Sequence, residues 1–230
     1  MKVLVEDFSS IWQRAAERKG GDTALQHLLT TPLSREHLAG ISDDRWLSAF
    51  TKTIFQSGFV WRVVENKWPD FERAFFDFEP EKMLMLDDSH IERLCNDASI
   101  IRNRQKIITV PQNAQMILDM ASEHGSFAKF IAQWPTDDIV GLWLFLKKHG
   151  ARLGGNSASY ALRRMGKDTF ILSGDVVAYL VNRGVVTKAP TSIKGLKAVQ
   201  QVFNSWQQQS GMPLAAISQT VAYSIGENNL

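Results

Sequence analysis

The segment that decides the fold is Leu146-Lys-Lys-His-Gly150-Ala-Arg-Leu-Gly154-Gly155-Asn-Ser-Ala-Ser-Tyr-Ala-Leu162-Arg-Arg-Met-Gly166. It predicts a helix that ends near Gly150, a short turn over residues 152–155, and a second helix from about Asn156 to Met165. Free backbone amides at the start of the second helix would point outward and suit a phosphate group. An ordinary turn between two helices, closed by a glycine, explains the same pattern equally well.

Basic residues surround this hairpin. Between residues 147 and 167 the chain has no acidic side chain and six basic ones besides His149, namely Lys147, Lys148, Arg152, Arg163, Arg164 and Lys167. Such a block fits a phosphate-binding surface, although a charged stretch is more often only a solvated face. The net charge of the whole chain, +2, neither requires nor excludes nucleic acid.

Apolar residues recur with helical spacing along almost the whole chain, and neither hairpin turns nor strand–helix alternation occur. We therefore predict an all-α protein, a single domain over residues 1–230, whose ten or more short helices form two helical lobes around a cleft. Pro69 is expected in the first turn of a helix, and residues 102–121 are expected to form one helix kinked or broken at Pro111. The clearest helical segments are 7–18, 42–55, 87–95, 191–206 and 213–225.

Composition limits the classes of protein. The 230 residues are 44% hydrophobic and 22% charged, which excludes low-complexity disorder, collagen and coiled coils. No apolar run reaches the roughly 18 residues of a membrane-spanning helix, and the N-terminus lacks the pattern of a secretory signal. Cys95 is the only cysteine, which excludes an internal disulfide, an iron–sulfur cluster and a Cys-rich zinc site. We therefore expect a cytoplasmic protein.

Asp175 lies nineteen residues after Asn156, at the start of a predicted helix, where an aspartate commonly serves as the cap. A hairpin followed at this spacing by an aspartate resembles the helix-hairpin-helix DNA glycosylase superfamily, in which the aspartate is catalytic. The resemblance implies that Asp175 stabilises the cationic sugar formed as the N-glycosidic bond breaks. It allows K⁺ or Na⁺ at the hairpin carbonyls. It also places Asn156 where bifunctional members carry a strand-cutting lysine, which implies a monofunctional enzyme.

A second series of motifs resembles the 3-methyladenine DNA glycosylase I family over about residues 42–181. The most specific motif is Ile100-Ile-Arg-Asn-Arg-Gln-Lys-Ile107, because ordinary helix packing does not require that run of polar residues after two isoleucines. Within it, Arg102, Arg104 and Lys106 could bind phosphate or serve only the structure. The other motifs are Gln56–Trp61, Phe71–Phe75, Phe78–Pro80, Ile91–Leu94, Asp97 and Asn113-Ala114.

This resemblance implies roles for single residues. Trp61 corresponds to the tryptophan that stacks on the flipped base, and Phe59 to the residue that fills the gap in the DNA, with core packing as the alternative for both. Thr53 stands where the family has a glutamate that hydrogen-bonds the purine edge. Asp175 stands where the family has a zinc-binding histidine, and the family's zinc cysteines are missing, so we predict no zinc.

These observations predict a monofunctional DNA N-glycosylase that excises alkylated purines resembling 3-methyladenine in base excision repair. It would flip the base and hydrolyse the glycosidic bond with the help of the aspartate. The expected partner is double-stranded DNA with an alkylated base, bound by a monomer at the bacterial nucleoid. The hairpin residues expected to bind it are Arg152, Gly154, Gly155, Asn156 and Ser157.

Two other functions remain open at this stage. The alternative is a protein that binds damaged or abasic DNA but catalyses no reaction. It stays open because Thr53 replaces the glutamate of the family. A helical scaffold that binds a protein through surface aromatic residues is the third hypothesis. Salt dependence of DNA binding would separate this last hypothesis from the others.

Overall fold

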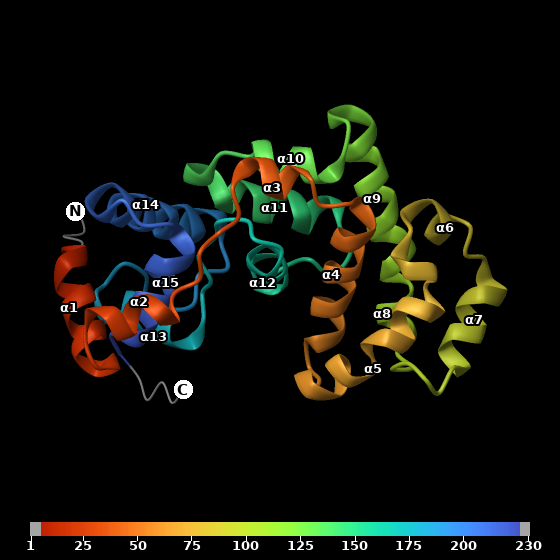
Figure 1. The fold of residues 1–230 in the computed structure, drawn as a ribbon, viewed down its shortest axis with the longest axis horizontal. Coiled ribbons are helices and arrows are strands. Elements are labelled where there is room, and N and C mark those ends of the chain that lie inside the picture. The colour runs from red at the N-terminus through yellow and green to blue at the C-terminus, as the bar shows by residue number, and fades with distance from the viewer. Residues whose placement is uncertain (1–5, 226–230) are drawn as a thin grey trace. The chain divides into compact units, whose positions relative to one another are not determined.

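The computed structural model describes residues 6–225, and all of its regular structure is helical (Figure 1). No strand occurs within that range, so the all-α prediction is confirmed. None of the helices described is long and apolar enough to cross a membrane. The first five residues, on which the prediction about a secretory signal partly rests, lie outside the described range. The chain divides into two compact units, each formed by separate stretches of sequence: residues 1–32, 135–140 and 168–230, and residues 33–134 and 141–167.

The first unit combines the N-terminal and C-terminal stretches of the chain. Its helix α15 packs against α1, α13 and α14, and an aromatic cluster fills the space between them. The rings of Phe170 and Phe203 stack with centroids 4.2 Å apart, and Trp206 packs edge-to-face on Phe203. The helices are α1 (Phe8–Lys19), α2 (Asp22–Leu28), the 3-10 helix η2 (Thr136–Asp138), α13 (Gly174–Asn182), α14 (Ile193–Ser210) and α15 (Leu214–Tyr223).

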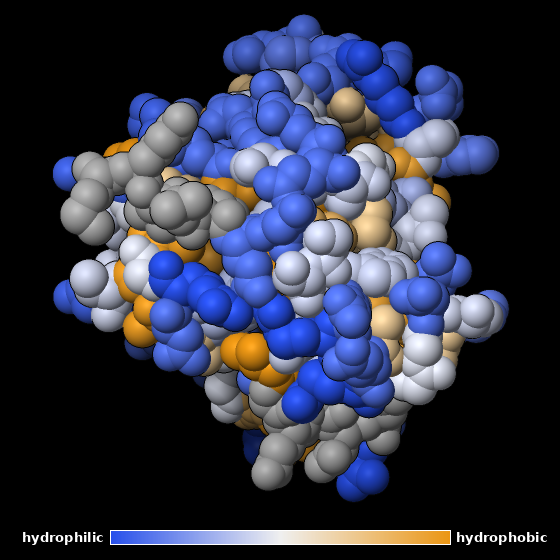
Figure 2. Space-filling model, turned by 90° about the vertical axis from the view of Figure 1, so that its left-hand side faces the viewer, coloured by the Kyte–Doolittle hydropathy of each residue, from blue (hydrophilic) through white to orange (hydrophobic). Residues whose placement is uncertain are grey.

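The face of the molecule that carries α1 and α14 is mostly hydrophilic, with only small and separate hydrophobic patches (Figure 2). The large apolar side chains of these helices point inward instead, since Ile11 is fully buried and Trp206 almost so. The part of this face not covered by grey atoms therefore shows no large contiguous apolar patch of the kind that marks many protein-binding surfaces.

A partly buried ion cluster in the first unit centres on Glu6. Its carboxylate accepts hydrogen bonds from Arg14 and from the hydroxyl of Tyr179, and it pairs with Arg183 at 2.8 Å. Burial and the neighbouring Glu6 carboxylate raise the pKa of Tyr179 to about 12. Tyr179 is 2% exposed, so its hydroxyl depends on this contact.

We predict that Tyr179→Phe changes the alkaline stability of the protein. The pKa of Tyr179 is higher in the folded chain than the value of about 10 in an unfolded chain. The contribution of the Tyr179 hydroxyl to the free energy of unfolding is therefore complete below pH 10. That contribution, about 2 kcal/mol, is lost as the pH rises from 10 to 12. Urea unfolding at a series of pH values should therefore show a shallower alkaline loss in Tyr179→Phe than in the parent. Tyr223→Phe, in α15 of the same unit, is the matched control, and identical slopes in all three proteins would contradict the prediction.

The second unit is built around α4 (Asp43–Gln56), which packs against several other helices of the unit. Ten of its 14 residues are buried, so α4 is enclosed on most sides. The other helices of this unit are α3 (Arg35–Ala39), α5 (Trp61–Ala74), the 3-10 helix η1 (Phe76–Phe78), α6 (Pro80–Leu84), α7 (Asp88–Asn96), α8 (Arg104–Ile107), α9 (Thr109–His124), α10 (Phe127–Gln133) and α12 (Ser157–Arg164). Helix α11 (Ile139–His149) begins in the first unit and continues into the second.

Two expectations about proline were wrong. Pro69 lies inside α5 rather than in a first turn, because the buried rings of Trp68 and Phe71 on either side of it hold the helix together. The expected helix over residues 102–121 is two helices, α8 and α9. The break falls near Ile108, and Pro111 lies in the first turn of α9, where its missing N–H costs little.

Candidate functional site

The hairpin between α11 and α12 has the predicted form. Gly150 follows the end of α11 and has no room for a side chain, because a Cβ there would lie 2.6 Å from Leu153 and 2.8 Å from the carbonyl oxygen of Leu146. Gly155 adopts a φ of +59°, a conformation that side chains disfavour. The helix α12 then begins at Ser157, close to the predicted start. The hairpin is therefore a tight turn whose glycines are required by its geometry.

A buried asparagine in α9 holds this hairpin in place. The side chain of Asn113 accepts a hydrogen bond from the backbone N–H of Ala151 at 2.8 Å and donates one to its carbonyl at 3.2 Å. Asn113 is fully buried, so both bonds are shielded from water. The sequence analysis did not assign it this role. The signal was available, because Asn113 is a polar residue on the apolar face formed by Val110, Ala114 and Ile117.

The basic residues of the hairpin fall into two groups. Arg152 is at the surface and has a φ of +57°, a strained conformation for a residue with a side chain, and it donates to Gln105 at 2.7 Å. Strain of this kind concentrates at functional positions. Lys167, in contrast, is 5% exposed and donates to the carbonyl of Trp134 at 2.7 Å. Lys167 therefore belongs to the core and not to a charged surface.

The turn between α4 and α5 is held by a buried lysine. The ammonium group of Lys106 donates to the carbonyls of Phe55 and Ser57 at 3.2 and 2.5 Å, at the end of α4. It also lies 4.5 Å from the centre of the Phe59 ring. Burial, and then the charge of Arg152, lower the pKa of Lys106. Of the two roles that the sequence left open for Lys106, the structural one is correct.

The residues that follow this turn are exposed although they are apolar. Phe59, Val60 and Trp61 are 39%, 67% and 51% exposed. The ring of Trp61 lies nearly perpendicular to the Tyr160 ring on α12, with centroids 5.7 Å apart. Core packing, the alternative for Phe59 and Trp61, is therefore wrong, and both rings are available to a ligand.

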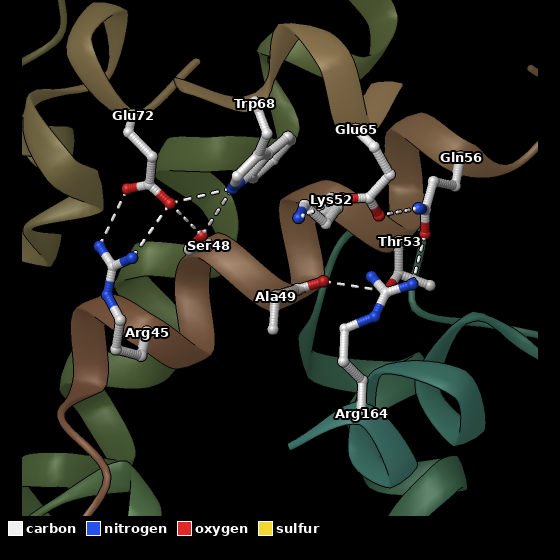
Figure 3. Close-up of polar contacts among 10 residues, drawn as sticks. All are labelled: Arg45, Ser48, Ala49, Lys52, Thr53, Gln56, Glu65, Trp68, Glu72 and Arg164. Carbon is white, nitrogen blue, oxygen red and sulfur yellow. Dashed lines mark hydrogen bonds and ion pairs between the residues drawn. The ribbon is translucent and has the colours of Figure 1, made fainter. Parts of the chain in front are cut away.

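Thr53 lies at the contact between α4 and α12. It is 6% exposed, and its hydroxyl donates to the carbonyl of Ala49 at 2.9 Å and accepts from Arg164 at 3.3 Å. The guanidinium of Arg164 also donates to Gln56 at 2.6 Å (Figure 3). Partial removal from water lowers the pKa of Arg164, with the charge of Glu65 acting in the opposite direction. The sequence places Arg164 only in the basic flank of the hairpin and does not predict its contact with Thr53.

Glu65 on α5 completes the polar group. One of its carboxylate oxygens accepts from Lys52 and the other from Gln56, both at 2.8 Å (Figure 3). The hydrogen bond from Lys52 outweighs burial and lowers the pKa of Glu65. A separate cluster stands further along α4, where Glu72 accepts from Arg45, Ser48 and Trp68. That second cluster is partly exposed and ties α5 to α4.

Asp175 belongs to the first unit, in the first turn of α13. The cap of this helix is Ser173, whose hydroxyl accepts from the backbone N–H of Val176 at 3.3 Å. The alternative role of Asp175 as the cap is therefore wrong. Its carboxylate makes no hydrogen bond or ion pair with the described part of the chain and is only half-buried. A partly exposed carboxylate without such a bond can contact a ligand.

The side chains described in residues 6–225 bring together no group of three or more His, Cys, Asp or Glu that could hold a metal ion. The hairpin itself offers backbone carbonyls, of which those of Ala151 and Gly154 each accept one hydrogen bond. Neutral oxygen atoms of this kind suit a monovalent cation and not zinc. The expected absence of zinc and the expected K⁺ or Na⁺ at the hairpin both stay predictions.

Solved structures of known proteins share this fold. An 8-oxoguanine DNA glycosylase of Methanocaldococcus jannaschii superposes with a TM-score of 0.58 at 12% identity, over 94% of this chain and 93% of that one. The 3-methyladenine DNA glycosylase I of Staphylococcus aureus superposes with a TM-score of 0.50 at 22% identity, over 68% of this chain and 91% of that one. The fold is therefore that of the helical DNA glycosylases.

Residues 41–187 match the family described as methyladenine glycosylase, and because this span exceeds half of the chain, the protein belongs to that family. DNA-3-methyladenine glycosylase 1 of Escherichia coli (strain K12) is 34% identical over 76 residues, 33% of this chain and 41% of that protein. DNA-3-methyladenine glycosylase of Haemophilus influenzae is 29% identical over the same length. The matched segment thus spans less than half of these relatives.

We predict that Lys106→Met lowers the free energy of unfolding by about 2 kcal/mol, because two carbonyls lose a charged donor in a buried place. Lys67→Met is the matched control. The ammonium group of Lys67 also donates to two carbonyls, those of Ala98 and Ser99, but these contacts are exposed. The control should therefore cost less than about 1 kcal/mol, since water replaces the lost donor. Urea unfolding measures both values, and equal costs would show that burial of Lys106 is unimportant.

Proposed function

We propose that this protein is a monofunctional DNA N-glycosylase that removes alkylated purines resembling 3-methyladenine during base excision repair. The observation that carries the proposal is the exposed ring of Trp61, in contact with Tyr160 on the helix whose Arg164 bonds to Thr53, in a chain of the methyladenine glycosylase family. The substrate class proposed is that of two relatives, both DNA-3-methyladenine glycosylases. DNA is the proposed partner, and a monomer the proposed state.

Binding begins at the hairpin and at the turn after α4. The tight turn at Gly154 and Gly155 leads into α12, at whose N-terminus a phosphate group would bind, and Arg152 adds positive charge. The side chain of Phe59 enters the DNA where the damaged base leaves the stack and offsets the loss of stacking. The flipped base then stacks on Trp61, and a cationic alkylated purine gains a cation–π contact there.

Bond cleavage is assigned to Asp175. The N-glycosidic bond breaks through a transition state with positive charge on the sugar, and a carboxylate beside that charge lowers the barrier. The base leaves with the electron pair of this bond, water adds to the cationic sugar, and the added water loses a proton to solvent. Because Asn156 cannot attack the sugar as a lysine would, the DNA backbone stays intact and an abasic site remains.

The hairpin carbonyls would hold K⁺ or Na⁺ when such an ion binds, and its charge would favour an adjoining phosphate. The residues of this chain supply the turn that presents those oxygens, and Asn113 fixes that turn against α9. No zinc is part of the proposal.

We predict that Asp175→Asn reduces base release by about 100-fold or more, the usual cost of removing an electrostatic group from a catalytic centre. The assay incubates duplex DNA treated with dimethyl sulfate and identifies the free bases by chromatography. Asp88→Asn is the matched control, because Asp88 also lies in the first turn of a helix, α7. Equal release by the parent and Asp175→Asn would remove Asp175 from the reaction.

The alternative function, binding of damaged or abasic DNA without chemistry, is favoured by one observation: Thr53 supplies no carboxylate to the base. The same experiment separates the two functions. If the parent protein binds abasic DNA tightly but releases no base from methylated DNA, the protein is a binder and the glycosylase proposal is wrong.

A further inference from the structure

Helices α5 and α12 both pack against α4, and two pairs of their side chains are linked. Trp61 and Glu65 are one turn apart on α5, and Tyr160 and Arg164 are one turn apart on α12. Trp61 contacts Tyr160, while Arg164 and Glu65 both bond to Gln56 of α4. An exposed aromatic ring and an accessible guanidinium are therefore linked to the same two helices, through Tyr160 and through Gln56.

The guanidinium of Arg164 is not neutralised by a direct partner. Its two hydrogen bonds are to neutral oxygen atoms, those of Thr53 and Gln56. Among the described residues it makes no ion pair, because the carboxylate of Glu65 is taken by Lys52 and Gln56. A guanidinium carries five N–H groups, so donors remain for a ligand.

Hydrogen-bond donors that face the O6 and N7 edge of a purine distinguish guanine from adenine. Guanine presents two acceptors on its edge, O6 and N7, which an arginine binds with two parallel hydrogen bonds. Adenine presents N7 as an acceptor but an amino group at position 6, which opposes a donor. Methylation at N3 leaves this edge unchanged and gives both bases a positive charge in DNA. The repulsion by Arg164 is thus common to both bases and cancels in a comparison of the two.

We propose that Arg164 is the specificity-determining residue of the base pocket and that its guanidinium selects N3-alkylated guanine over N3-alkylated adenine. The inference rests on the proposed glycosylase function and names the substrate class within it. Gln56 and Thr53 hold the guanidinium in position, and Trp61 supplies the stacking surface. The pocket thus reads the base edge through donors and not through a carboxylate.

The test measures a ratio of two products from a single reaction. Duplex DNA treated with dimethyl sulfate contains both 3-methylguanine and 3-methyladenine, and each initial rate of release is divided by the amount of that base in the DNA. The parent should favour 3-methylguanine. Arg164→Gln should lower the ratio by about five- to 150-fold, the range expected for loss of a bidentate contact with guanine. Because both rates come from the same enzyme, the ratio does not depend on the fraction that is folded.

Two further variants make the result specific. Arg164→Lys keeps the positive charge but loses the planar pair of donors, and it should also lower the ratio. Arg93→Gln on α7 removes a charge outside the site and should leave the ratio unchanged. If the parent and all Arg164 variants release both bases with the same ratio, or if Arg164→Lys retains the parent ratio, the inference is wrong. If the parent releases neither base, the proposed function itself fails.

Discussion

The buried ammonium of Lys106 is the constraint on which the candidate site depends. It occupies the end of α4, where the last carbonyls of a helix have no partners within the helix, and it holds the chain there as it leaves for α5. A charge buried to this extent is stable only because these carbonyls surround it. With the turn fixed, Phe59 and Trp61 remain exposed in spite of their apolar character, and apolar side chains exposed together suit a ligand-binding surface.

A second constraint positions the hairpin relative to the same helices. Asn113 satisfies both backbone groups of Ala151 with one side chain, and thereby fixes the turn that precedes α12. Since α12 carries both Tyr160 and Arg164, the orientation of the hairpin also sets the position of the aromatic pair and of the guanidinium. Phosphate binding and base recognition are therefore linked through one short helix of the second unit.

Much of the fold could be predicted from the sequence, because glycines and helical spacing act locally. The hairpin, α4 and its buried face, and the cap of α7 at Asp87 all follow from nearby residues. The position of Pro69 could not, since contacts made by its neighbours override its own preference. The same limit applies to the site. Trp61 was predicted from a resemblance, but the contact between Arg164 and Thr53 joins residues more than a hundred positions apart, and no local pattern marks it.

The most direct test of this account is a crystal structure of the protein with duplex DNA that contains a tetrahydrofuran analogue of an abasic site. The account predicts that Phe59 fills the gap in the base stack, that Trp61 lines the emptied base site, and that the amides at the start of α12 contact a phosphate. A duplex bound on a face that includes neither the turn after α4 nor the hairpin would contradict it.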